Sequence, residues 1–321
     1  MDAKLRYVEI KKLFGQYDVE WNIEKDTTVL VGQNGSGKTT ILKVLMTALS
    51  NEHKVVDSLA NDIIGALSKV DLYLSDERHI RAIYNRENFD SYLDYFLNSN
   101  RDDKESMFKS LSEFSKMPIN SLSVSQKFMK CDSNDDAAKQ EYAIELISTL
   151  NLSANALNNV PVGDGTDLNV LDVQIERAII AFQKLRELEN YSEIKDKVIQ
   201  VLNDFFSTTQ KTIELSDTDF VIKNLKKEVL KLSQLSAGER QIIYIVFKVA
   251  TAYFNEALIL MDEPEISLHL EWQEKLLKNL REINDKSQMI VVTHSPAIIM
   301  DGWMDSYVDI QTILKPVKDD E

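Results

Sequence analysis

Short apolar stretches separated by polar positions mark both ends of the chain. Between residues 4 and 31, three stretches rich in β-branched and aromatic residues (VEIKKL, YDVEW and TVLV) predict strands. Residues 41–50 carry apolar side chains at helical spacing. From Leu235 onward apolar helices alternate with apolar strands, and the strands ALILMDEP and QMIVVTHSP end in polar residues. This alternation predicts a parallel sheet covered by helices on both faces.

The middle of the chain has a helical pattern instead. Apolar side chains recur every three or four residues in two sets, Ile175, Ala178, Phe182, Leu185 and then Ile194, Val198, Val201, Phe205. They predict a helical hairpin over 172–206, although each set spans only about two heptads, too few for a long coiled coil. KTIEL, DFVIK and EVLKL, within 211–232, predict short strands that return to a sheet. We therefore expect an α/β domain formed by 1–50 and 211–321, with a mainly helical insertion at 51–210.

The composition excludes some classes of binding partner but does not identify one. The net charge is −15, and an acidic surface repels phosphate backbones, so free nucleic acid is not the expected partner. A solvated face is the favoured reading for a cluster of four lysines, Lys223, Lys226, Lys227 and Lys231. Cys131 is the only cysteine, which excludes an intrachain disulfide and fits a reducing cytoplasm. The longest apolar stretch, Ile242 to Phe254, is too short to span a membrane, and the N-terminus lacks the apolar region of a signal peptide.

The stretch GQNGSGKT, at 32–39, matches the phosphate-binding pattern G-x-x-x-x-G-K-[ST]. Its glycines let the loop turn its N–H groups inward, where they and the next helix N-terminus can bind a β-phosphate. Lys38 can reach the β- and γ-phosphates, and the Thr39 hydroxyl can hold Mg²⁺. The strand before and the helix after argue against a chance glycine turn. The predicted ATP-binding residues here are Gly32, Gln33, Asn34, Gly35, Ser36, Gly37, Lys38, Thr39 and Thr40.

Two later strand ends add candidate chemistry. Asp262 closes the apolar strand ALILMD, where an aspartate can orient Mg²⁺, and Glu263 can polarise the water that attacks the γ-phosphate. His294 ends another apolar strand about thirty residues later. Because the ends of parallel strands converge on a ligand, His294 can contact the γ-phosphate and the attacking water. The alternative for Asp262 and Glu263 is an acidic strand end without a chemical role, and the alternative for His294 is a structural histidine. The presence of the phosphate-binding loop makes both alternatives less favoured.

The turn LSAGER, at 235–240, resembles the signature of ABC-type ATPases, best known as LSGGQ. The order of phosphate-binding loop, long insertion, signature, DEP and histidine is also the order of that family. The resemblance implies that Ser236 and the N–H groups around Gly238, with Glu239 beside them, face the ATP of a partner subunit. Bulk at Gly238 would then block the phosphate. Ser236 can also cap the following helix, with Glu239 completing a capping box, and both readings can hold.

The particular residues of the motifs indicate a smaller group within this family. LSAGER, MDEPEISLHLEWQ and VVTHSP together are similar to the RecF-like and OLD-like ABC ATPases, which include ATPase subunits of antiphage systems such as Septu, PARIS and retron-associated modules. The resemblance covers roughly 1–50 and 211–310. It implies a P-loop NTPase of ABC type, with a mixed, mainly parallel sheet and a helical insertion. It also puts Ser267, Leu268 and His269 near a dimer seam.

Three features depart from that pattern. In that family a glutamine usually links the phosphate-binding half to the helical insertion. Here Gln126 in SVSQKF is only a weak candidate, and a residue without this role is the favoured interpretation. The absence of a long coiled-coil pattern argues against an SMC-type DNA clamp. The chain also ends soon after the His294 strand, which leaves no room for a Toprim domain. We therefore expect any nuclease activity to belong to a separate protein.

These observations predict an ABC-type ATPase that binds ATP and Mg²⁺ in a head-to-tail homodimer or higher homo-oligomer. ATP binding would close the dimer and hydrolysis would open it. The resemblance implies that this switch holds or licenses an effector protein, such as a nuclease or Toprim protein, in bacterial antiphage defence, with nucleic acid contacted through that partner. The alternatives are a RecF-like DNA maintenance ATPase with ATP-dependent DNA binding, a transporter subunit, and an ATP-binding scaffold.

Overall fold

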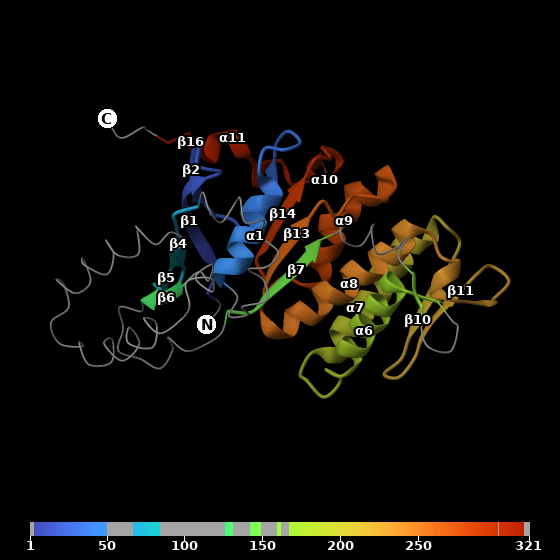
Figure 1. Ribbon diagram of the computed structural model, residues 1–321. Helices are drawn as coiled ribbons and strands as arrows, with labels where there is room; N and C mark the ends of the chain where they lie inside the picture. The colour runs from blue at the N-terminus through green and yellow to red at the C-terminus, as the bar shows by residue number, and fades with distance from the viewer. Residues whose placement is uncertain are drawn as a thin grey trace. The chain divides into compact units, whose positions relative to one another are not determined.

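The computed structural model describes residues 3–49, 67–83, 126–130, 142–148, 159–161, 167–300 and 302–317. The chain divides into two compact units, whose elements are labelled in Figure 1. One unit comprises Met1–Glu24, Thr40–Tyr142 and Ile310–Glu321, and the other comprises Lys25–Thr39 and Ala143–Asp309. The division predicted from the sequence, with an insertion at 51–210, stays a prediction.

The second unit contains a five-stranded parallel sheet. Its strand order is β15 (Tyr307–Asp309), β3 (Thr27–Val31), β14 (Met289–Thr293), β13 (Leu258–Asp262) and β7 (Ile144–Ser148). Every residue of β13 and β14 is buried, as their unbroken apolar sequences predict for a sheet covered on both faces. The pairing aligns Asp262 with Val292 on one side and with Ser148 on the other, so these strands end at the same edge of the sheet.

Helices of the second unit pack around this sheet and on one another (Figure 1). They are α6 (Val170–Gln183), α7 (Tyr191–Ser207), α8 (Ala237–Asn255), α9 (Leu270–Ile283) and the short α10 (Ala297–Met300). The apolar spacings seen in the sequence correspond to α6 and α7, which place Phe182, Ile194 and Phe205 in the core beside α8 and α9. The side chain of Asn169 begins α6 by accepting hydrogen bonds from the N–H groups of Leu171 and Asp172.

A small antiparallel sheet precedes α8. It is formed by β10 (Thr212–Leu215), β11 (Phe220–Lys223) and β12 (Val229–Leu230), and a 3₁₀ turn, η4 (Leu232–Gln234), leads from it to α8. The predicted strands therefore exist, but they form a sheet of their own and do not join the parallel sheet. Lys223 pairs with Glu214 at 2.7 Å, and the other three lysines of the cluster are exposed, as a solvated face requires.

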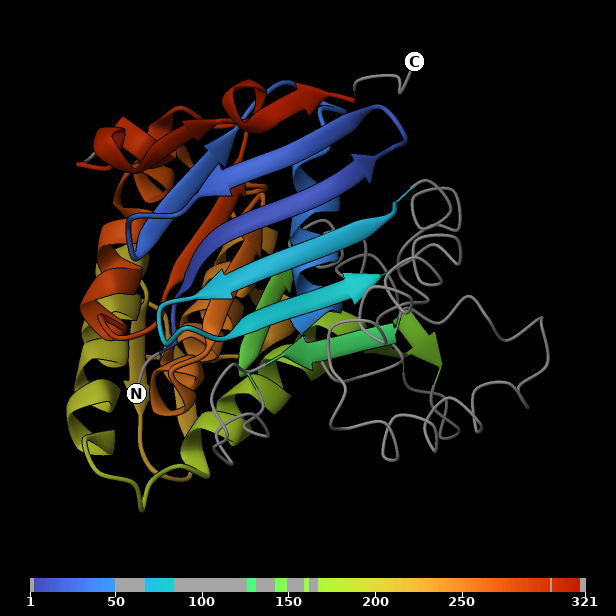
Figure 2. The ribbon, with the colours of Figure 1, turned by 90° about the vertical axis from the view of Figure 1, so that its left-hand side faces the viewer.

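The first unit is built on an antiparallel sheet, which Figure 2 shows face on. Its order is β16 (Leu314–Pro316), β2 (Tyr17–Asn22), β1 (Leu5–Leu13), β4 (Lys69–Leu74), β5 (His79–Ile83) and β6 (Gln126–Lys130), with the short α11 (Ile310–Ile313) before β16. Strands β4 to β6 lie within 51–210, where we expected mainly helix. In β4, the apolar residues Val70, Leu72 and Leu74 alternate along the sequence with Lys69, Asp71 and Tyr73, a strand pattern that the sequence analysis did not identify.

Four short elements complete the description. The strands β8 (Asn159–Pro161) and β9 (Asp167–Asn169) form a two-stranded sheet, and η5 (Met304–Ser306) precedes β15. Helix α1 (Lys38–Leu49) follows the phosphate-binding loop. Among the described residues, no helix combines the length and the apolar character needed to cross a membrane.

Candidate functional site

The phosphate-binding loop connects β3 to α1. Gly35 and Gly37 have φ angles of 75° and 97°, in the left-handed region that glycine adopts at least cost, so these two positions require glycine. The Lys38 ammonium lies over the loop and donates to the carbonyls of Gly32 and Gln33, each at 2.9 Å. Burial lowers the pKa of Lys38, although the carboxylates of the site oppose that shift. The loop thus holds a cation where a phosphate would bind.

The other predicted loop residues differ in how far they are exposed. The Ser36 hydroxyl is buried and has no hydrogen-bond partner among the described residues, which suits a group that waits for a phosphate oxygen. Asn34 is exposed at the tip of the loop, and Thr40 follows Thr39 in α1. The donors and the unpaired hydroxyl fit a nucleotide phosphate at this place.

A hydrogen bond joins the two predicted magnesium ligands. The Thr39 hydroxyl donates to Asp262 Oδ1 at 2.8 Å, although the two residues are far apart in sequence. A hydroxyl that donates its proton keeps a lone pair for a metal ion, and a carboxylate and a hydroxyl are oxygen ligands of the kind Mg²⁺ prefers. The described residues contain no cluster of three or more carboxylate, histidine or cysteine side chains able to hold a metal alone. The pair therefore fits a magnesium ion that takes its remaining ligands from phosphate and water.

Glu263 and His294 lie next to this pair. His294 Nε2 is 3.1 Å from Glu263 Oε1, and His294 Nδ1 is 3.5 Å from the Lys38 ammonium. With a proton on Nε2, the ring can donate to Glu263 and present the Nδ1 lone pair to the lysine. Glu263 has a φ of 50°, uncommon for a residue with a side chain, and its N–H donates to the Val292 carbonyl at 2.8 Å. The predicted base and histidine are thus together, at the edge where β13 and β14 end.

Glu265 is a site residue that the sequence reading missed. Its carboxylate is buried, and Oε1 accepts hydrogen bonds from the Thr293 hydroxyl and the His294 N–H, at 2.5 and 2.9 Å. The signal available in the sequence was a third acidic residue, two positions after Glu263, in a stretch with apolar neighbours. A buried carboxylate is usually paired with specific hydrogen-bond donors or cations.

The signature turn begins α8. Ser236 Oγ accepts from the Glu239 N–H at 3.2 Å, and Glu239 Oε2 accepts from the Ser236 N–H at 2.9 Å, so the predicted capping box is confirmed. Glu239 is 2% exposed and also pairs with Lys211 at 2.5 Å. Burial raises the pKa of Glu239, but Lys211 and the Ser236 N–H outweigh it and hold the pKa below its ordinary value. We expected Glu239 beside a partner's nucleotide, and this geometry instead occupies its carboxylate within its own chain.

Gly238 is required for a reason that differs from the predicted one. A Cβ atom at this position would lie 2.4 Å from the Ser267 carbonyl oxygen. The glycine therefore lets α8 approach the turn 263–268 of the same chain, whereas the prediction from the sequence concerns only the space for a phosphate. Gln241 adds to this contact by donating to the Pro264 carbonyl at 2.8 Å. Ser236 and Ala237 are the exposed residues of the turn.

Gln126 belongs to the antiparallel sheet and not to the parallel sheet that carries the site residues. It begins β6 of the antiparallel sheet, opposite Ile83. Two strands flank Asp262, β14 and β7, and the last residue of β7, Ser148, is aligned with it. Residues 149–158, which follow, lie outside the described residues. The sequence YAIELIS carried the signal for this strand and was not recognised.

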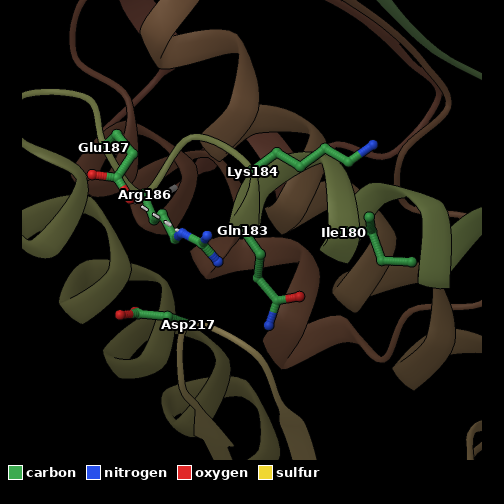
Figure 3. A pocket seen from close by; sticks show the side chains of 6 residues that line it. All are labelled: Ile180, Gln183, Lys184, Arg186, Glu187 and Asp217. Carbon is green, nitrogen blue, oxygen red and sulfur yellow. Dashed lines mark hydrogen bonds and ion pairs between the residues drawn. The ribbon is translucent and has the colours of Figure 1, made fainter.

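A separate hollow of about 310 Å³ lies where α6 ends (Figure 3). Its lining is Ile180, Gln183, Lys184, Arg186, Glu187 and Asp217, and includes charges of both signs. The Arg186 guanidinium bonds Glu187, and Gln183 donates to the Ser216 carbonyl. None of the predicted site residues lines it.

The fold is that of an ABC-type ATPase with the architecture of an SMC head. A solved SMC head bound to the C-winged helix domain of ScpA superimposes with a TM-score of 0.57 at 15% identity, covering 98% of this chain and 97% of that one. At this identity the likeness concerns the fold. The chain belongs to the family described as "AAA domain, putative AbiEii toxin, Type IV TA system", which matches residues 27–301.

Two curated relatives extend along most of the chain. The Septu protein PtuA of Bacillus thuringiensis is 23% identical over 316 residues, which cover 92% of this chain and 72% of PtuA. The protein named "Retron Vc95 probable ATPase", of Vibrio cholerae, is 22% identical and is aligned over 86% of this chain and 67% of its own length. The resemblance inferred from the motifs, to ATPase subunits of antiphage systems, is confirmed.

Proposed function

We propose that this protein binds ATP with Mg²⁺ and hydrolyses it at a site completed by a second copy of the chain. The observation that carries the proposal is the meeting of two pairs at one sheet edge. Thr39 is bonded to Asp262, and Glu263 is bonded to His294. The first pair suits the metal that accompanies a nucleotide, and the second suits a water molecule and the proton it releases.

The phosphates would be held by the loop N–H groups, the start of α1 and Lys38. The ammonium of Lys38 now bonds two carbonyls of its own loop, and a phosphate oxygen is a stronger acceptor that would draw it away. Mg²⁺, held by Thr39 and Asp262, would neutralise charge on the phosphates. Each of these contacts lies within one chain.

Hydrolysis requires a base and a group that keeps it oriented. Water would attack the γ-phosphorus, its proton would pass to Glu263, and the bond to the β-phosphate oxygen would break. His294 Nε2 fixes Glu263 at 3.1 Å and brings its ring close to Lys38. The side chains of Glu263 and His294 are 19% and 30% exposed, so both are accessible to water and substrate.

The second copy would contribute its signature turn. Ser236 and Ala237 are exposed at the start of the 19-residue helix α8, whose N-terminus favours an anion. The capping box and the contact with Ser267 hold this turn in place before any partner arrives. A rigid, exposed helix start suits the γ-phosphate on another subunit's loop. ATP would then join two copies, and hydrolysis would release them.

A role in defence is supported by the relatives. Proteins named for Septu and for a retron are aligned with most of this chain. We propose that the closed dimer holds or licenses a separate effector protein. The test is phage plating on cells that carry the gene with its neighbours, against the same genes with Lys38→Ala. If cells that carry Lys38→Ala are still protected from phage, defence does not depend on nucleotide binding and the proposed role is wrong.

The ATPase proposal has a direct test in the purified protein. Binding of a fluorescent ATP analogue and release of phosphate are measured for the parent and for Lys38→Ala. The variant should lose binding by about a hundredfold or more, because the buried cation that meets the phosphates is gone. Unchanged binding in Lys38→Ala, or no ATP binding by the parent, would refute the proposed function.

A further inference from the structure

Glu265 is a buried carboxylate that the hydrolysis scheme does not use. It lies in the turn 263–268 after β13 and is 8% exposed. Two residues of this turn, Glu263 and Ser267, have positive φ angles of 50° and 69°. The turn is therefore held in a conformation that residues with side chains seldom adopt, and it brings the Glu265 carboxylate to the end of β14.

All the hydrogen bonds found for this carboxylate come from one short segment. Glu265 Oε1 accepts from the Thr293 hydroxyl at 2.5 Å, from the His294 N–H at 2.9 Å and from the Ser295 N–H at 3.2 Å. Glu265 Oε2 is buried and has no hydrogen-bond partner among the described residues. One oxygen thus gathers three donors, which fixes the backbone of 293–295 tightly.

The fixed segment carries His294. Its ring contacts two groups of the proposed site, Glu263 Oε1 at 3.1 Å and the Lys38 ammonium at 3.5 Å. A shift of the His294 backbone by a fraction of an ångström would lengthen the first contact or lose the second. Glu265 is therefore in a position to control the ring without touching a substrate.

The residue after His294, Ser295, makes further hydrogen bonds that do not involve Glu265. Ser295 Oγ donates to Gln273 Oε1 at 2.6 Å and accepts from the Ala297 N–H at 3.2 Å, and the Ser295 N–H also contacts the Thr293 hydroxyl at 2.9 Å. These bonds keep the segment attached to α9 when Glu265 is removed. The His294 N–H, by contrast, is held by Glu265 Oε1.

We propose that Glu265 is the positioning residue for His294: it holds the His294 backbone so that the ring orients Glu263 for hydrolysis. This inference rests on the proposed ATPase function. The role of Glu265 is indirect, so its loss should lower turnover and leave ATP binding unchanged.

A double-mutant cycle tests the indirect role. Phosphate release and ATP affinity are measured for the parent, Glu265→Ala, His294→Ala and the double variant. Glu265→Ala should lower kcat by about ten- to a hundredfold, as a small displacement of a catalytic group does, with ATP affinity unchanged within about threefold. In the His294→Ala background the same change should cost less than about threefold, because the residue it positions is absent. An equal loss in both backgrounds would overturn the proposal.

A second measurement reads the position of His294 without turnover. The chain has four histidines, so ring signals of ¹³C-labelled histidine can be assigned by single substitutions. Glu265→Ala should move or broaden the His294 signal and leave that of His79, which bonds Asp71 in the other unit, unchanged. Glu274→Ala, the same change at an exposed position on α9, is the matched control. An unmoved His294 signal would refute the positioning role.

The two proposals fail separately. A parent protein without ATP turnover would end the proposed function, while the His294 signal would still decide the role of Glu265. If Glu265→Ala does not fold, Thr293→Val removes one of the three donors and leaves the carboxylate in place. That variant should shift the same signal by a smaller amount, and an unchanged signal there would equally contradict the proposal.

Discussion

The phosphate-binding edge and the signature turn are both polar ends of apolar elements, but their side chains have opposite surroundings. The phosphate-binding edge consists of Lys38, Thr39, Asp262, Glu263 and His294. Its side chains bond one another across three elements, and two of them remain accessible. In the signature turn, 235–240, the Glu239 side chain is buried against its own chain, and so is that of Gln241, the next residue after the turn.

This difference indicates that the polar residues at the ends of apolar elements can serve either chemistry or structural support. Acidic and basic groups that face one another and remain accessible suit chemistry. A carboxylate enclosed by a capping box and a lysine, as Glu239 is, suits a rigid support. We therefore expect substitutions at the phosphate-binding edge to remove activity at constant stability. Substitutions in the buried part of the signature turn should reduce stability first.

The largest effect is expected for Glu263→Gln. Loss of the base should lower the rate of phosphate release by about a thousandfold, while ATP binding and the melting temperature stay near those of the parent. ATP should then hold the variant as a dimer, visible by light scattering after gel filtration. Glu274→Gln on α9 is the control at an exposed position. Hydrolysis at the parental rate would remove Glu263 from the role of base.

Ser236→Arg should block dimer closure. A long cation at the exposed helix start would occupy the place of a partner's phosphate, so turnover should fall by about a hundredfold while monomer ATP binding is kept. Ser236→Ala separates closure from capping, because it removes the cap at a cost of about 1 kcal/mol without adding bulk. ATP-dependent dimers in Ser236→Arg, seen by light scattering, would show that this turn is structural only.

Gly238→Ala should reduce stability more than any other single methyl addition to the signature turn. Its Cβ would lie 2.4 Å from the Ser267 carbonyl oxygen, and backbone must move to accept it. We expect the free energy of unfolding to fall by about 3 kcal/mol, measured by urea denaturation. Ala237→Ser, at the exposed neighbouring position, should change it little. If Gly238→Ala were as stable as the parent, the backbone of the turn 263–268 would be able to move aside at little cost in free energy.

The smallest effect concerns Glu239 and pH. Its pKa is held below the ordinary value of 4.5 in the folded protein, so the stability it contributes is present above that value and is lost as the pH falls through its lower, folded pKa. Glu239→Gln should cost about 1 kcal/mol at pH 7 and weaken the acid dependence of unfolding. Denaturant midpoints measured from pH 7 to pH 3 for both proteins provide the check. Parallel curves would contradict the assignment.

The phosphate-binding edge could be predicted because each part is encoded locally. The glycines of 32–37 define the loop, and two apolar strands end in Asp262 and His294. The predicted strands β13 and β14 are confirmed, and their ends are adjacent because parallel strands align their termini. Nothing beyond strand order was needed to bring these side chains together.

The remainder depends on contacts between distant segments. The constraint on Gly238 comes from the Ser267 carbonyl, and the role of Glu265 comes from the end of β14. One of the two strands that flank Asp262 is β7, more than 100 residues earlier in the chain. Neither hydrophobic periodicity nor a motif records such pairings, so the sequence did not predict that Glu239 pairs with Lys211 or that β7 pairs with β13.

The order of strands in the parallel sheet has a consequence for the newly made chain. The two neighbours of β3 are β14 and β15, both more than 250 residues downstream. A ribosome adding roughly 5–20 residues per second needs on the order of 10–50 s to supply them. Until then the strand that carries the phosphate-binding loop has no neighbour in its sheet. We therefore expect the sheet around the phosphate-binding loop to be complete only after residue 309 has been synthesised.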